Sequence, residues 1–158
     1  MGTNFYAVVP LKKRELKEQI NNAIDNDNLG EAREILEEAA SEHEIHLGKR
    51  SGGWKFLFNA NEEKYYPLTK DGINKFIDDN NAVIRDEYGR DYTKEEFWED
   101  VKIFNEKGVD AEGYHRENPD EPDYYYTYCS EVLKKYKPNR YGEFYSDGLR
   151  FTTCSDFS

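Results

Sequence analysis

Apolar residues in the first part of the chain follow first a strand period and then a helical period. Residues 5–9 form a short aromatic and β-branched run, which is typical of a strand. Leu16, Ile20 and Ile24 then recur every four residues, so a helix is predicted over residues 11–25.

A second helix is predicted to begin at Asn28, because Asn28 and Glu31 have the spacing of a capping box. Its apolar stripe consists of Leu29, Ala32, Ile35, Leu36 and Ala39. Only the polar turn 25–28 separates the two helices, so they are expected to form an antiparallel helical hairpin.

Residues 44–49 and 54–59 are predicted strands joined by a glycine turn. Gly52 and Gly53 supply the positive φ angles that tight hairpin turns need. In the second strand the aromatic side chains occupy alternate positions and share one face, which is expected to be the core face: Trp54, Phe56 and Phe58.

Two further helices carry clear N-cap signals. Thr69 precedes a short helix, and Thr93 precedes another in which Glu96 completes a capping box. A later helix is predicted from the apolar spacing between Tyr125 and Tyr136.

The remaining strands complete the prediction of the fold. Residues 82–85 form a short strand, and residues 143–145 and 149–153 flank Asp147-Gly148, a strong hairpin signal. Since the strands come mostly as hairpins, the sequence predicts an α+β fold: an antiparallel sheet built from hairpins with four or five helices packed on it. The whole chain, residues 1–158, is expected to be one domain, with residues 107–123 as a mobile acidic loop within it.

The net charge of the chain limits the classes of partner that it is expected to bind. The chain has 33 acidic and 22 basic residues, a formal net charge of −11, which disfavours direct binding to nucleic acid or to an anionic membrane and favours basic partners. No apolar run approaches the roughly 20 residues that a membrane span needs. With two cysteines and no leader-like start, the expected compartment is the reducing cytoplasm.

The glycine-rich hairpin is a candidate ligand site. Its backbone N–H groups and nearby cations could bind a phosphate or carboxylate, as in a nucleotide. The residues that would form this site are His46, Lys49, Arg50, Ser51 and Trp54. The alternative is a hairpin whose turn simply requires glycine, since the spacing does not match a Walker A loop.

Metal binding and catalysis have weaker signals. His43 and His46 would need His115 to complete a metal site, and the sequence predicts neither a metal nor a cofactor. Cys129 and Cys154 lack the flanking residues of a known nucleophile motif, so the sequence favours a protein that is not an enzyme without deciding the point.

An acidic segment followed by a tyrosine run is a candidate protein-binding surface. Tyrosines 124–126 cannot all face inward on a helix, and exposed tyrosine is enriched at interfaces. The residues predicted to contact a partner are Glu117, Asp120, Glu121, Asp123, Tyr124 and Tyr126. The alternative is an ordinary solvated surface.

Four blocks of the sequence stand out: the start at residues 1–6, the motif at residues 46–56, the turn at residues 86–90 and the helix start at residues 93–98. They resemble a family of small uncharacterised proteins from bacteriophages and prophages, and the resemblance is spread in blocks over about half of the chain. The resemblance implies a phage origin and a location in the cytoplasm of the host bacterium, but no particular chemistry.

These observations lead to two functional hypotheses. The first is a phage accessory protein that inhibits a basic host protein, such as a nuclease or another defence effector, by charge mimicry. The second is a binding protein, or an enzyme, whose ligand is a nucleotide or another small molecule held at the glycine-rich hairpin. The sequence leaves the oligomeric state open.

Overall fold

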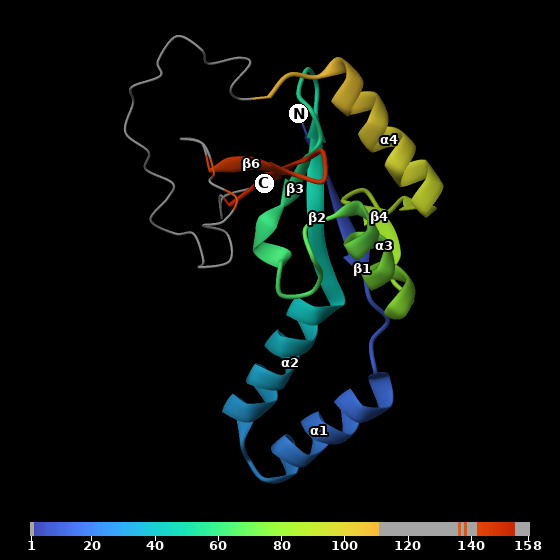
Figure 1. Ribbon diagram of the computed structural model, residues 1–158. Helices are drawn as coiled ribbons and strands as arrows, with labels where there is room; N and C mark the ends of the chain where they lie inside the picture. Colours follow the sequence, from blue (N-terminus) through green and yellow to red (C-terminus); the bar gives the residue numbers. More distant parts are fainter. Residues whose placement is uncertain (1, 111–135, 137, 139–141, 154–158) are drawn as a thin grey trace.

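A computed structural model describes residues 2–110, 136, 138 and 142–153, and these form an α+β fold around one sheet (Figure 1). The strand order is β5-β4-β1-β2-β3-β7-β6. The strands are β1 (Gly2–Val8), β2 (Glu44–Ser51), β3 (Leu57–Asn59), β4 (Val83–Asp86), β5 (Asp91–Tyr92), β6 (Glu143–Ser146) and β7 (Leu149–Thr152). The helices of the described residues are α1 (Lys13–Asp25), α2 (Leu29–His43), α3 (Lys70–Asp79) and α4 (Lys94–Lys107), with a short 3-10 turn, η1 (Ala60–Glu62).

The sheet is mostly antiparallel, as predicted, but hairpins alone do not build it. Strand β1, in the interior of the sheet, pairs antiparallel with β2 and β4, which lie far from it in the sequence. The strands β3 and β7 pair in parallel, with Phe58 opposite Phe151. The prediction of a sheet built from hairpins is therefore only partly correct, because pairing between distant strands has no local sequence signal.

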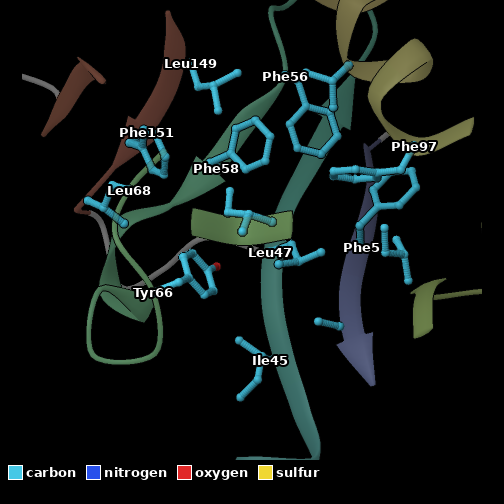
Figure 2. Packing of buried hydrophobic residues seen from close by; sticks show 14 of the residues in the cluster. Phe5, Ile45, Leu47, Phe56, Phe58, Tyr66, Leu68, Phe97, Leu149 and Phe151 are labelled. Atoms are coloured by element: carbon cyan, nitrogen blue, oxygen red, sulfur yellow. The ribbon is translucent and has the colours of Figure 1, made fainter. Parts of the chain in front are cut away.

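An aromatic core covers one face of the sheet (Figure 2). Phe5 lies 5.6 Å from both Phe56 and Phe97, measured between ring centroids, and 5.2 Å from Tyr92. Helices α3 and α4 pack on the same face, since their buried residues Ile73, Ile77, Phe97 and Val101 belong to this core. The prediction that Trp54, Phe56 and Phe58 face the core is confirmed for Phe56 and Phe58, which are fully buried, but not for Trp54, which is half-buried and lies outside the core cluster.

The predicted caps and the second hairpin are confirmed. The side chain of Asn28 accepts a hydrogen bond from the Glu31 amide, and Thr93 and Glu96 form a complete capping box. Thr69 caps α3 in the same way. The turn between β6 and β7 places Asp147 and Gly148 at φ angles of 53° and 74°, the positive values of a tight hairpin turn.

The glycine-rich hairpin differs from the prediction in its second strand. Strand β3 begins at Leu57, and Trp54 instead forms an isolated bridge with Val109 beyond α4. Of the two turn glycines only Gly53 has a positive φ, 82°. The glycine with the tightest packing in this hairpin is Gly48 in β2, where a Cβ would lie 2.4 Å from the Leu57 carbonyl oxygen.

Helices α1 and α2 form the predicted hairpin, which extends beyond one end of the sheet, away from the strands (Figure 1). Its buried residues are small, Ala23 and Ala32. The expected stripe positions Ile24, Leu29 and Leu36 are exposed, by 49%, 72% and 51%. The sequence pattern was misleading here because each helix packs mainly against the other and leaves part of its apolar stripe uncovered.

Two predictions fall on residues outside the described part of the chain. The helix expected between Tyr125 and Tyr136 lies there, apart from Tyr136 itself, whose ring stacks on Phe144. Of the expected loop 107–123, Lys107 is the last residue of α4, residues 108–110 are described, and the rest lies outside. Among the described residues, no helix has the length and apolar character needed to cross a bilayer.

The close approach at Gly48 gives a test of the β2–β3 packing. The change Gly48→Ala should lower the free energy of unfolding by about 1–3 kcal/mol, because the added methyl group meets backbone atoms of β3. Thermal unfolding followed by circular dichroism measures the effect. Gly52→Ala is the matched control, since no atom lies within 4 Å of the position that its methyl group would take, and equal melting temperatures for both variants would contradict the packing.

Candidate protein-binding surface

A row of carboxylates runs along one side of α2. It consists of Glu31, Glu34, Glu38 and Glu42, whose spacings of three and four residues place them on one side of a helix. At about 1.5 Å of rise per residue the row spans roughly 16 Å. This set is called the glutamate row below.

The glutamate row faces solvent and is not neutralised by its own helix. All four residues are exposed, and α2 contains five glutamates but only one arginine. That arginine, Arg33, bonds Glu37 outside the row at 3.2 Å. Within the described residues, Glu34, Glu38 and Glu42 form no ion pair. Like charges at this spacing destabilise a helix by about 0.2–0.5 kcal/mol per pair, so the row does not serve the stability of the hairpin.

Exposed leucines lie on the other side of the same helix. The face of α2 toward α1 contains Ala32, Ile35 and Ala39. Helical geometry places the glutamate row along one edge of this face, and Leu29 and Leu36 along the other edge. The hairpin therefore presents charge and apolar area together, a combination that is common at protein interfaces.

A groove of about 460 Å³ lies where the helical hairpin meets the rest of the protein. Glu38 and Glu42 of the glutamate row line it, together with Leu16 of α1. From the other side it is lined by Tyr65, which precedes α3, and by Phe76 of α3. The groove is thus bordered by both the hairpin and the body of the fold.

The residues of the predicted ligand site point in different directions. His46 and Lys49 pair with Tyr6 and Asn4 of β1, and share the face of the sheet opposite the core. Arg50 lies on the helix side, where its guanidinium bonds Asp100 of α4 at 2.5 Å and lies 5.6 Å from the ring centroid of Phe5.

The other two residues of this prediction lie at the far end of the same hairpin. Ser51 ends β2, and the Trp54 ring lies under the Arg150 guanidinium, 5.4 Å from it. Arg150 is itself buried and paired with Glu143. Of the five predicted residues, the structure therefore gathers only His46 and Lys49 on one surface. In the turn itself, Gly53 has the positive φ for which glycine is suited.

His46 is part of a polar chain that links β2, β1 and the turn after β4. Its Nε2 lies 3.0 Å from the side-chain oxygen of Asn4, and its ring stacks on Tyr6 with centroids 5.0 Å apart. The backbone N–H of Asn4 donates in turn to Glu87. Burial lowers the pKa of His46 below its ordinary value of 6.5, and the Lys49 charge acts in the same direction, against the opposing effects of the Gly48 backbone and Glu87.

The two histidines considered as metal ligands, His43 and His46, bond different parts of the fold. The Nδ1 of His43 bonds the Val9 carbonyl, whereas His46 bonds Asn4 on another strand. Within the described residues, no three metal-ligating side chains lie together. His115, Cys129 and Cys154 lie outside them.

The predicted partner-binding residues also lie outside the described part of the chain. They are Glu117, Asp120, Glu121, Asp123, Tyr124 and Tyr126, and they stay a prediction. The glutamate row was missed by the sequence reading, although the spacing of its members along a predicted helix was visible. The groove could not have been found, because Tyr65 and Phe76 reach it only through the fold.

Comparison with known proteins adds no assignment: the sequence matches no protein-family model, and neither a curated protein nor a solved structure is significantly similar to it.

The environment of His46 predicts a pH dependence of stability. Below pH 6.5 the unfolded chain protonates His46 more readily than the folded protein does, so the free energy of unfolding should fall as the pH falls toward the lowered folded pKa. His46→Gln removes this contribution. Urea unfolding of both proteins between about pH 7.5 and pH 5.5 should show a smaller loss of stability in the variant. Parallel pH profiles would contradict the assignment.

Proposed function

We propose that this protein binds a basic, nucleic-acid-handling protein and inhibits it by presenting carboxylates where nucleic-acid phosphates would lie. The observation that carries the proposal is the glutamate row on α2, exposed on a hairpin that extends from the sheet (Figure 1). The proposed role is binding and has no catalytic step.

The charge density of the row supports this mechanism. Four carboxylates over the span of the row give roughly one charge every 5 Å, while each strand of a DNA duplex has one charge about every 3.4 Å along the axis. A surface of lysine and arginine that is arranged for phosphates therefore meets a comparable series of negative charges. The net charge of −11 would also steer such a partner toward the protein.

The proposed class of partner rests on the sequence resemblance and on the negative charge of the protein. The resemblance to phage proteins favours a partner in the host bacterium, such as a nuclease or another defence effector. The acidic residues at 117–123 would add to the same field, since their charge has the same sign. The exposed Leu29 and Leu36 offer apolar contact area on the same helix.

The proposal is tested by capture from a bacterial lysate with the tagged protein, followed by elution with heparin. We expect basic nucleic-acid-handling proteins to be retained at low salt and released both by high salt and by heparin, which competes as a polyanion. With the purified partner, the protein should raise the KM for nucleic acid and leave kcat unchanged, because the two compete for one surface.

A charge-matched pair of variants isolates the glutamate row. The triple change Glu34→Gln, Glu38→Gln and Glu42→Gln should weaken binding to the captured partner by about tenfold or more. The control removes three exposed carboxylates from α4, by Glu95→Gln, Glu99→Gln and Glu106→Gln. Equal losses in both triples, or a complex that heparin does not displace, would refute the proposed mechanism.

A further inference from the structure

The groove beside the helical hairpin is large enough to admit an extended side chain of another protein. Its volume, about 460 Å³, lies within the usual range of binding pockets, roughly 300–1,000 Å³. It is bordered on one side by α1 and α2, and on the other by Tyr65 and by Phe76 of α3. A ligand here would contact both the hairpin and the body of the fold.

The floor of the groove is apolar and partly aromatic. Leu16 and Ile35 contribute from the hairpin, and the rings of Tyr65 and Phe76 lie 5.9 Å apart between centroids. All four side chains are only half-buried, so part of their surface is open to a ligand. An aliphatic stem can pack on such a floor, and a flat cation can lie over an aromatic ring.

One ring of the floor already contacts a cation of the protein itself. The ammonium of Lys64 lies 5.0 Å from the centroid of the Tyr65 ring. Lys64 is exposed, so this contact is open to competition from another cation.

The rim of the groove is negatively charged. Glu15 of α1 faces it from one helix, and Glu38 and Glu42 of α2 from the other. Lys12 is the basic residue of the lining, so with histidine counted as neutral the lining has an excess of two negative charges. Within the described residues, none of the three carboxylates forms an ion pair. The groove therefore offers an apolar floor and anionic edges to a cationic side chain.

We infer that this groove holds an arginine side chain from a basic segment of the partner protein. The stem would lie on the apolar floor, and the guanidinium would stack on an aromatic ring and bond the carboxylates of Glu38 and Glu42. Arginine fits better than lysine because its planar guanidinium both stacks on rings and bonds carboxylates in a two-pronged manner. The inference rests on the proposed function and specifies which side chain of the partner anchors the complex.

The test uses fluorescence anisotropy with a labelled oligo-arginine peptide and an oligo-lysine peptide of equal length. We expect the wild-type protein to bind the arginine peptide several-fold more tightly. The double change Glu38→Gln and Glu42→Gln should weaken that binding by about tenfold and remove the preference. Lys12→Gln should strengthen binding, since it removes the opposing charge.

The matched control removes two exposed carboxylates of the helical hairpin that lie outside both the groove and the glutamate row, by Glu18→Gln and Glu37→Gln. Neither residue lines the groove, so this control should change affinity only about twofold. Chemical-shift changes on adding the arginine peptide should centre on Leu16, Ile35, Tyr65 and Phe76.

The outcomes separate this inference from the proposed function. Equal losses in the two double variants, or equal affinity for the two peptides, would overturn the arginine site and leave charge mimicry standing. If the groove binds arginine selectively but heparin does not displace the captured partner, the arginine site is supported and charge mimicry is refuted.

Discussion

The fold depends on the burial of Phe5 in the interior strand β1. Its ring contacts Phe56, Phe97 and Tyr92, which come from the segment before β3, from α4 and from β5. The guanidinium of Arg50 also lies over this ring, and Asp100 of α4 holds it there. One fully buried side chain thus joins the middle of the sheet to its edge and to the helix that covers it.

The helical hairpin lies outside this core, which explains its unusual surface. Because α1 and α2 bury mainly alanines between them, several of their larger apolar residues and most of their charges remain exposed. The groove forms where this loosely covered hairpin meets α3, so an anionic edge and an aromatic floor come together there. The charge and aromatic character of this surface therefore depend on where the hairpin lies in the fold, and no single sequence motif produces them.

Local features of the fold could be read from the sequence, whereas distant pairings could not. The caps at Asn28, Thr69 and Thr93 follow from side chains within three residues, and the Asp147-Gly148 turn from two adjacent residues. The parallel pairing of β3 with β7 has no such local cause. The same holds for the candidate surface. The spacing of the glutamates can be read from the sequence of one helix, whereas Tyr65 and Phe76 reach the groove only through the tertiary fold.

The pairing of β3 with β7 has a consequence for synthesis on the ribosome. Strand β3 can pair with β2 as soon as both have emerged, but its other edge stays open until residues 149–152 are made. During that interval Phe58 lacks the Phe151 ring that it contacts in the finished sheet. The nascent chain thus exposes an unpaired strand edge beside an aromatic side chain, a known route to aggregation, and the β6–β7 hairpin closes that edge.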